Sequence, residues 1–374
     1  MRYQRWATGL AIAAMAVTVS ACGAAGDADG DAAAAAPDGA AGETDGGSPA
    51  DLATGDDEAD PAEEPPGPEL RIVSTVAPIA DLVARVLGDR GEVHTLVPTG
   101  MDSHTYEPRP SDVVPLSDAD AFIGNGLDLN PAAVALAEAN LPEGTPLVLL
   151  GEEALDEDAL SDEHWHDDDH GHSHDHDHSH DHDHSHGGVN PHVWTSVPNV
   201  LAYVDVIEAT LTGLDHDGAD GYAARADAFR DELTALDEAI QRSVDSLDED
   251  RRKLVVYHDA WTYFGRTYGV EVVAAVQPSD HAEPSASDVR AIIDQIRAED
   301  VPAVFGAEEF PTSVAATIAD ETGATYVGDL ADDTLPGEPG DPEHSYVGMM
   351  VENVRRIVEA LGGDASPLAA STPG

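Results

Sequence analysis

The largest concentration of metal-binding side chains in this sequence is a histidine-rich stretch near the middle of the chain. Eleven of the 18 histidines lie between residues 164 and 186, where they alternate with aspartate and serine. They are His164, His166, His170, His172, His174, His176, His178, His180, His182, His184 and His186. Imidazole and carboxylate groups both bind zinc, and a stretch this polar cannot form a buried core. A cloning tag would lie at a terminus, so we interpret residues 164–186 as an exposed metal-collecting loop beside a fixed site.

Four other side chains with the chemistry of metal ligands follow predicted strands. They are His104, His192, His258 and Asp333. Since ligand sites in open α/β sheets lie beyond the carboxyl ends of the strands, these four side chains can meet in space. Three imidazoles and one carboxylate would form a tetrahedral shell for zinc, whereas oxygen-rich shells suit Mn²⁺ or Mg²⁺. The adjacent Asp332 leaves the identity of the carboxylate ligand open.

A carboxylate close to the first of these histidines gives a further expectation. Glu107 lies three residues after His104 and can orient its ring by accepting a hydrogen bond. A simple turn before Pro108 explains the same residues equally well. Glu107 is therefore a candidate supporting residue.

The elements that must position these residues alternate between strands and helices. In the first half, strands are predicted at 70–76, 92–98, 121–126 and 146–151, with helices at 78–87, 111–119 and 131–141. In the second half, strands are predicted at 253–257, 271–276, 303–307 and 325–329, with helices at 261–268, 287–298, 312–322 and 346–361. This order predicts an α/β fold with two lobes, each a parallel sheet flanked by helices. Ser285 and Asp288 have the spacing of a capping box before the helix at 287–298.

A long helix is predicted between the two lobes, after a shorter one at 197–211. Apolar residues recur every three or four positions over 221–246, which gives the helix one apolar stripe. They are Tyr222, Ala226, Phe229, Leu233, Leu236, Ile240 and Val244. At 1.5 Å per residue this helix is about 40 Å long, so it is either a core helix or a strut that joins two lobes.

Both ends of the chain differ from the part that is predicted to fold. Residues 1–21 hold two arginines before an apolar run too short for an ordinary membrane span, which indicates a signal peptide. Val19-Ser20-Ala21-Cys22 is similar to a bacterial lipobox, so Cys22 is the predicted lipidation site; cleavage of an ordinary signal peptide near Ala21 is the alternative. Cys22 is the only cysteine, which excludes a disulfide within the chain. Residues 22–68 are predicted to be a disordered acidic tether, and residues 364–374 a frayed tail.

These boundaries divide the remaining chain into three parts. Residues 69–196 form the predicted N-terminal lobe with the histidine-rich loop, 197–250 the connecting helices, and 251–363 the C-terminal lobe. The formal net charge is −57, from 74 acidic and 17 basic residues, which argues against nucleic acid and anionic bilayers as electrostatic partners. This charge is consistent with an exported protein that attracts cations.

Five short segments occur in an order that is typical of one protein family. They are Ser103-His104-Thr105-Tyr106-Glu107-Pro108, Asn190-Pro191-His192-Val193-Trp194, Tyr257-His258-Asp259-Ala260-Trp261-Thr262-Tyr263-Phe264, Glu283-Pro284-Ser285 and Ser345-Tyr346-Val347-Gly348-Met349-Met350. The set resembles the zinc and manganese solute-binding proteins of bacterial ABC importers, the ZnuA-type family (cluster A-I), over about residues 70–362. The resemblance implies two α/β lobes joined by one long helix, with metal bound in the cleft between them by His104, His192, His258 and Asp333. Manganese members tend to carry glutamate at the third position, so His258 and the histidine-rich loop favour Zn²⁺ over Mn²⁺; many zinc members use water as the fourth ligand.

The resemblance implies a binding function. We expect a monomeric zinc-binding lipoprotein, anchored to the outer face of the cell membrane through Cys22, that delivers Zn²⁺ to an ABC permease and its ATPase. A zinc metallochaperone is an additional expected partner. A zinc-buffering or adhesin-type surface protein and a manganese-specific binding protein stay open as alternatives. A zinc hydrolase is disfavoured, because four protein ligands leave no open position for water and no His-Glu-x-x-His or Gly-x-Ser-x-Gly sequence occurs.

Overall fold

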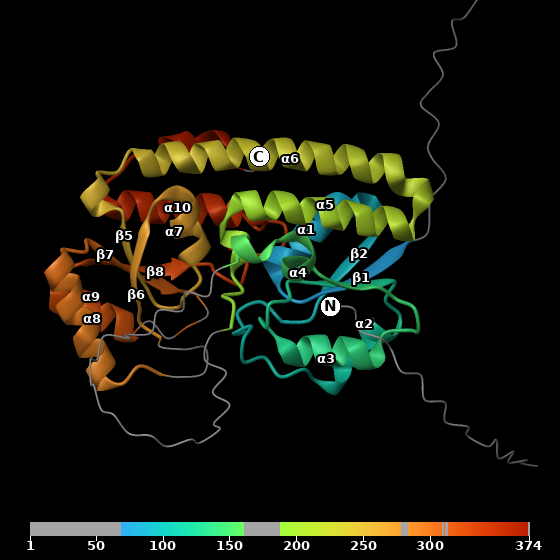
Figure 1. Ribbon diagram of the computed structural model, residues 1–374, viewed down its shortest axis with the longest axis horizontal. Coiled ribbons are helices and arrows are strands. Elements are labelled where there is room, and N and C mark those ends of the chain that lie inside the picture. Colours follow the sequence, from blue (N-terminus) through green and yellow to red (C-terminus); the bar gives the residue numbers. More distant parts are fainter. Residues whose placement is uncertain (1–68, 161–187, 278–282, 309, 311–312, 373–374) are drawn as a thin grey trace, which may run out of the picture. The chain divides into compact units, whose positions relative to one another are not determined.

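Two parallel sheets of four strands each form the framework of the molecule (Figure 1). The first sheet has the strand order β2-β1-β3-β4, and the second has the order β6-β5-β7-β8. All neighbouring strands in both sheets run parallel. The predicted α/β class with two lobes is confirmed.

The computed structural model describes residues 69–160, 188–277, 283–308, 310 and 313–372. The predicted signal peptide, the tether with Cys22 and the histidine-rich loop at 164–186 lie outside the described residues. Within the described part, no helix is long and apolar enough to cross a membrane.

The first lobe follows the predicted alternation of strands and helices. Its elements are β1 (Leu70–Ser74), α1 (Ala77–Leu87), β2 (Gly91–Thr95), α2 (Val113–Ser117), β3 (Ala121–Gly124), α3 (Pro131–Asn140), β4 (Leu147–Leu149) and α4 (Leu150–Ala154). All four residues of β3 are buried, as expected for an internal strand of a parallel sheet covered on both faces. The strands are shorter than predicted; β4, for example, ends at Leu149 because α4 begins at Leu150.

The second lobe repeats this arrangement. Its elements are β5 (Lys253–Val256), α7 (Thr262–Tyr268), β6 (Glu271–Ala275), α8 (Ala286–Glu299), β7 (Ala303–Ala307), α9 (Ser313–Thr322), β8 (Thr325–Leu330) and α10 (Tyr346–Leu361). The predicted capping box at the start of α8 is confirmed. Ser285 Oγ accepts a hydrogen bond from the backbone N–H of Asp288, and an Asp288 side-chain oxygen accepts one from the N–H of Ser285.

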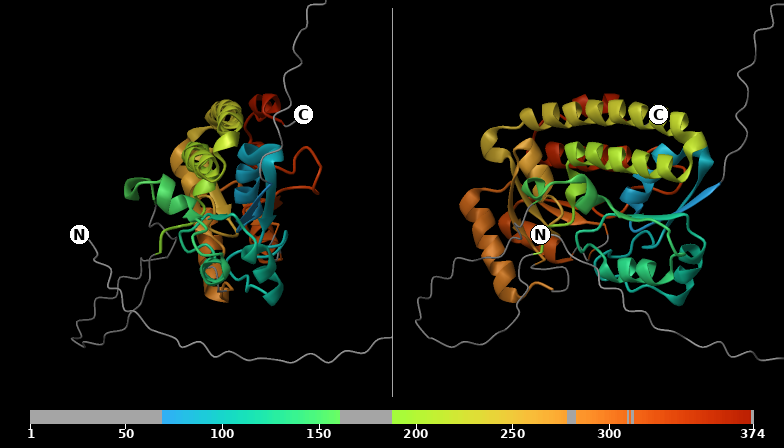
Figure 2. Two further views of the ribbon diagram at one scale, coloured as in Figure 1. Left: turned by 90° about the vertical axis from the view of Figure 1, so that its right-hand side faces the viewer. Right: turned by 45° about the vertical axis from the view of Figure 1, so that its right-hand side comes forward.

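Two helices connect the lobes, α5 (Val197–Leu214) and α6 (Ala219–Asp245). The seven residues of the predicted apolar stripe on α6 are all buried. This helix packs against α1 of the first lobe, against the other connecting helix α5 and against α10 of the second lobe. It passes over both sheets in Figure 1 and in the right-hand view of Figure 2. The long connecting helix that the sequence predicted is confirmed.

The end of the chain differs from its prediction. Ser366–Ala370 forms a 3-10 helix that packs against α6. Leu368 is buried there. The expectation of a frayed tail is wrong for these residues, because burial of one leucine holds a short segment that shows no periodic pattern of its own.

Candidate metal centre

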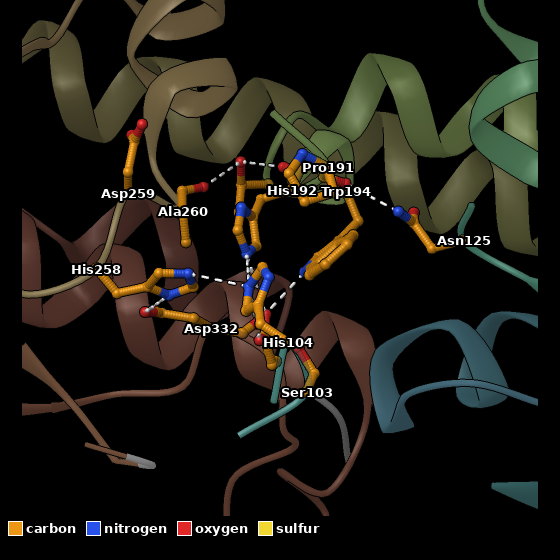
Figure 3. Close-up of polar contacts among 12 residues, drawn as sticks. Ser103, His104, Asn125, Pro191, His192, Trp194, His258, Asp259, Ala260 and Asp332 are labelled. Carbon is orange, nitrogen blue, oxygen red and sulfur yellow. Dashed lines mark hydrogen bonds and ion pairs between the residues drawn. The ribbon is translucent and has the colours of Figure 1, made fainter. Parts of the chain in front are cut away.

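The four side chains that the sequence singled out as metal ligands converge in the structure. Figure 3 shows His104, His192 and His258 pointing toward one another. His104 Nε2 lies 3.0 Å from His192 Nε2 and 3.1 Å from His258 Nε2. The carboxylate oxygens of Asp333 lie 3.7 Å from Nε2 of His104 and 3.5 Å from Nε2 of His192. One ligand atom from each of the four residues lies within 4.8 Å of all the others. The loops that follow β2, β5 and β8 and the segment that precedes α5 therefore supply one cluster.

The separations between these atoms have the size expected around a single ion. In a tetrahedral zinc shell the ligands lie about 2.0–2.1 Å from the metal, which places neighbouring ligand atoms about 3.3 Å apart. The four separations given above run from 3.0 to 3.7 Å, and all ligand atoms of the cluster lie within 4.8 Å of one another. All four side chains are also buried, with exposed fractions of 9% for His104, 2% for His192, 2% for His258 and 7% for Asp333. A buried group of lone pairs is costly unless a cation or a proton lies among them.

The loop that carries His104 is held from inside the first lobe. Asn130, the N-cap residue of α3, donates hydrogen bonds from Nδ2 to the carbonyl oxygens of Ser103 and Tyr106. Asp102 Oδ1 accepts a hydrogen bond of 2.9 Å from the backbone N–H of His104. These contacts fix the backbone on both sides of the ring and aim it towards the second lobe.

His192 is held by the residue two positions before it. Asn190 Oδ1 lies 2.9 Å from Nδ1 of the His192 ring and 3.0 Å from the backbone nitrogen of His192. The next turn is the 3-10 helix Val193–Thr195, whose Trp194 indole is buried. Trp194 Nε1 donates a hydrogen bond of 3.0 Å to the carbonyl oxygen of Asp332 in the second lobe.

The adjacent aspartates face different parts of the centre. Asp333 lies beside Nε2 of His104 and His192, and its Oδ2 accepts a hydrogen bond of 2.5 Å from the Ser103 hydroxyl. Asp332 lies behind His258 instead, with Oδ2 at 3.4 Å from His258 Nδ1 and Oδ1 accepting a 3.0 Å hydrogen bond from Trp261 Nε1. Burial raises the pKa of the Asp332 carboxyl, while the hydrogen bonds from His258 and Trp261 act in the opposite direction. Of the two adjacent aspartates, Asp333 is therefore the one that lies in the cluster of candidate ligands.

The predicted roles of Glu107 and of the histidine-rich loop are not supported by the described residues. Glu107 is exposed to solvent, whereas the four candidate ligands are buried, so its predicted role behind His104 gains no support from its position. The eleven histidines of residues 164–186 lie outside the described part of the chain, and their auxiliary role stays a prediction.

Sequence reasoning assigned no supporting role to the residues that hold the candidate ligands, and it considered Asp332 only as an alternative ligand. Ser103, Asn190 and Asp332 each contact one of the four side chains. The available signal was adjacency, since each lies within two residues of a predicted ligand. Adjacency alone does not say which neighbour turns towards the ring.

Known proteins resemble this chain over most of its described part. The family described as "Zinc-uptake complex component A periplasmic" (ZnuA) matches residues 72–360. The manganese-binding lipoprotein MntA of Halalkalibacterium halodurans is 31% identical over 299 residues, which cover 79% of this chain and 89% of that protein. The iron-binding protein YfeA of Yersinia pestis is 26% identical over 294 residues, covering 79% of this chain and 87% of that one. The solved structure of the periplasmic zinc-binding protein TroA from Treponema pallidum is 27% identical, with a TM-score of 0.67 and coverage of 79% and 99%.

Proposed function

Because this chain belongs to the family of zinc-uptake complex component A proteins, we propose that it captures Zn²⁺ outside the cytoplasm and delivers it to an ABC import permease. The observation that carries the proposal is the convergence of three imidazole nitrogens and one carboxylate within 4.8 Å of one another. Three neutral nitrogen ligands and one anionic oxygen ligand form a shell that suits zinc. Four protein ligands around one ion also favour storage of the ion over hydrolytic chemistry at it, because no coordination position is reserved for water.

Because the candidate ligands are attached to two different lobes, movement of the lobes can capture and release the zinc ion. His104 belongs to the first lobe, whereas His258 and Asp333 follow strands of the second lobe. Burial of the cluster means that an ion held there has exchanged its water shell for protein ligands. A partner that separates the lobes would move His104 away from His258 and Asp333, and the incomplete shell would release the ion.

A manganese-specific protein is the second candidate function. MntA is named for manganese and YfeA for iron, whereas TroA is named for zinc. The ligand set of this chain favours zinc over these metals, since Mn²⁺ prefers shells richer in oxygen than three imidazoles and one carboxylate. A zinc buffer or adhesin at the cell surface is a third candidate, in which the stretch 164–186 would be the main metal-binding part.

The parts outside the described residues complete the proposal. Residues 1–21 would be the signal peptide, Cys22 the lipid anchor, and residues 22–68 the tether that holds the lobes at the outer face of the membrane. MntA is named a lipoprotein, which supports this arrangement. The histidine-rich stretch would gather zinc for the buried centre or accept it from a metallochaperone, and the permease would act with its ATPase.

Zinc titration against a competing chelator tests the proposal on three forms of the protein that begin at residue 69. The first keeps the histidine-rich stretch, the second lacks residues 164–186, and the third lacks them and carries His104→Ala with His258→Ala. We expect one tight zinc ion in the second form and none in the third, because removing two of four ligands dismantles the shell. Parallel titrations with Mn²⁺ should show weaker binding to the second form.

Three outcomes would contradict parts of this proposal. Loss of all tight zinc binding on deletion of residues 164–186 would favour the buffer function. Equal zinc binding by the second and third forms would exclude the buried cluster as the metal site. Tighter binding of Mn²⁺ than of Zn²⁺ would favour the manganese-specific function.

A further inference from the structure

One amide side chain contacts both a candidate ligand and the segment that carries another. We propose that Asn190 is a positioning residue, which fixes the tautomer and orientation of the His192 ring and ties it to the loop of His258. This inference rests on the proposed function, because it concerns how the same centre is prepared for its ion. Asn190 itself does not point into the cluster of ligand atoms.

The Asn190 side chain is buried, and its amide oxygen and nitrogen are both hydrogen-bonded. Only 1% of the residue is exposed. Its Oδ1 lies 3.0 Å from the backbone nitrogen of His192 and 2.9 Å from His192 Nδ1. Its Nδ2 donates a hydrogen bond of 2.8 Å to the carbonyl oxygen of Asp259.

These partners fix which way the amide faces. A carbonyl oxygen only accepts, so the atom next to the Asp259 carbonyl must be the NH₂ group. A backbone N–H only donates, so the atom next to the His192 nitrogen must be the amide oxygen. The reversed amide would place two donors together at one end and two acceptors at the other, and each unsatisfied buried group costs free energy.

The orientation of the amide determines the tautomer of His192. Because Oδ1 accepts, the proton of the neutral ring must be on Nδ1. The lone pair is then on Nε2, the atom that lies 3.0 Å from His104 Nε2 and 3.5 Å from Asp333 Oδ1. An imidazole binds a metal only through a nitrogen with a free lone pair, so Asn190 holds His192 in the form that can bind.

The same residue joins His192 to the second lobe. Asp259 directly follows His258, and the Asn190 amide donates to its carbonyl oxygen. The Tyr263 hydroxyl donates a hydrogen bond of 2.8 Å to the backbone carbonyl of Asn190. The Thr195 hydroxyl shares its proton between the carbonyl oxygens of His192 at 2.9 Å and Ala260 at 3.2 Å. The segment that carries His192, which the sequence assigned to the first lobe, is thus hydrogen-bonded to the His258 loop. The centroids of the His192 and His258 rings lie 4.5 Å apart.

The test compares three substitutions in the full chain, so that the histidine-rich stretch is the same in each. Asn190→Ala removes the acceptor and the donor. Asn190→Asp keeps an acceptor for the Nδ1 proton and loses the bond to the Asp259 carbonyl. Asn199→Ala is the matched control, since Asn199 donates a 3.1 Å hydrogen bond from the same kind of side chain to the Val193 carbonyl in the same segment.

Two measurements follow each variant. Zinc affinity is measured by competition with a chelator, and the ¹⁵N shifts of the His192 ring, assigned by their loss in His192→Ala, report its tautomer without metal. We expect Asn190→Ala to lower zinc affinity by about 10–100-fold, the range for the loss of a residue that orients a metal-binding histidine, and to mix the tautomers. Asn190→Asp should restore most of the affinity and the Nδ1-protonated ring, and Asn199→Ala should change neither.

Several results would overturn the inference. The first is a His192 ring that is protonated on Nε2 in the unsubstituted, metal-free protein. The second is a zinc affinity of Asn190→Ala equal to that of the unsubstituted protein. The third is a zinc affinity of Asn190→Asp that does not exceed that of Asn190→Ala. If Asn190→Ala does not fold, the ¹⁵N shifts of the His192 ring in the unsubstituted protein and the zinc affinity of Asn190→Asp still test the inference. Absence of tight zinc in the unsubstituted protein would instead reject the proposed function, while the tautomer would still be measured.

Discussion

At the scale of single residues, Asp332 and Asp333 are neighbours in sequence with different surroundings. Asp333 contacts Ser103 and the Nε2 atoms of two histidines, whereas Asp332 contacts the Nδ1 atom of His258 and the indole of Trp261. Both carboxylates are buried. One therefore has the position of a ligand, and the other has the position of a group that orients a ligand.

The two positions predict different losses of metal affinity. Asp332→Asn should weaken zinc binding by about 10–100-fold, because the ring of His258 loses its charged partner but stays in place. Asp333→Asn should weaken it more, because the shell loses its only anionic ligand. Chelator competition on the form without residues 164–186 measures both. Equal losses, or the larger loss for Asp332→Asn, would reverse the two roles.

At the scale of elements, the turn between α5 and α6 is held by a buried charged group. Asp215, which ends α5, accepts hydrogen bonds from Arg90 at 2.6 Å and from the Tyr222 hydroxyl of α6 at 2.9 Å. Burial opposes the ionisation of Asp215, but the hydrogen bonds from Arg90 and Tyr222 outweigh it and lower the pKa of its carboxyl. The contact ties the start of α6 to the end of α1 through the short 3-10 helix Gly88–Arg90.

This depressed pKa predicts a pH-dependent contribution to stability. A carboxyl whose pKa is lower in the folded state stabilises the fold above the unfolded pKa of about 3.9, and the contribution disappears as the pH falls through the folded pKa. Asp215→Asn should therefore lower the Tm at pH 7, and the difference from the unsubstituted protein should shrink as the pH falls below about 4.

The check is thermal unfolding followed by circular dichroism across this pH range. Asp217→Asn is the matched control, because Asp217 lies in the same turn and is exposed to solvent. A difference in Tm between Asp215→Asn and the unsubstituted protein that stays constant with pH would show that the carboxylate charge does not stabilise the turn.

At the scale of the whole folded unit, α6 limits how far the lobes can move. Its 27 residues contain no proline, and its only glycine is Gly221 near its start. Sharp bends in helices occur at proline, glycine pairs or irregular turns, so α6 has no such point along its length. It also packs against α1, α5 and α10, which belong to different halves of the chain.

We therefore expect zinc to change the order of loops more than the global dimensions. Small-angle scattering on the form from residue 69 without 164–186 should show little contraction on zinc addition. Amide exchange should slow in the loop around His104, whose ring is the candidate ligand from the first lobe. A large decrease in the radius of gyration with zinc would contradict this restriction by α6.

Several features of this protein were determined by its sequence. The apolar stripe of α6 and the capping box of α8 depend on residues a few positions apart, so local spacing was sufficient to find them. His104, His192, His258 and Asp333 were recognisable as candidates because ligand-type side chains in loops after parallel strands share one edge of a sheet. The lipidation of Cys22 and the metal-collecting role of residues 164–186 stay predictions from the sequence.

Only the tertiary structure decided which neighbours face the centre. The position of Asp333 in the cluster and of Asp332 behind His258, the contacts of Asn190 and the exposure of Glu107 depend on how loops from both lobes pack together. The burial of Leu368 at the chain end depends likewise on contact with α6. The periodicity of apolar residues in the sequence indicates which face of one helix or strand is buried. These contacts, in contrast, join residues that lie far apart in the chain. Their geometry is set by packing, and no local pattern in the sequence encodes it.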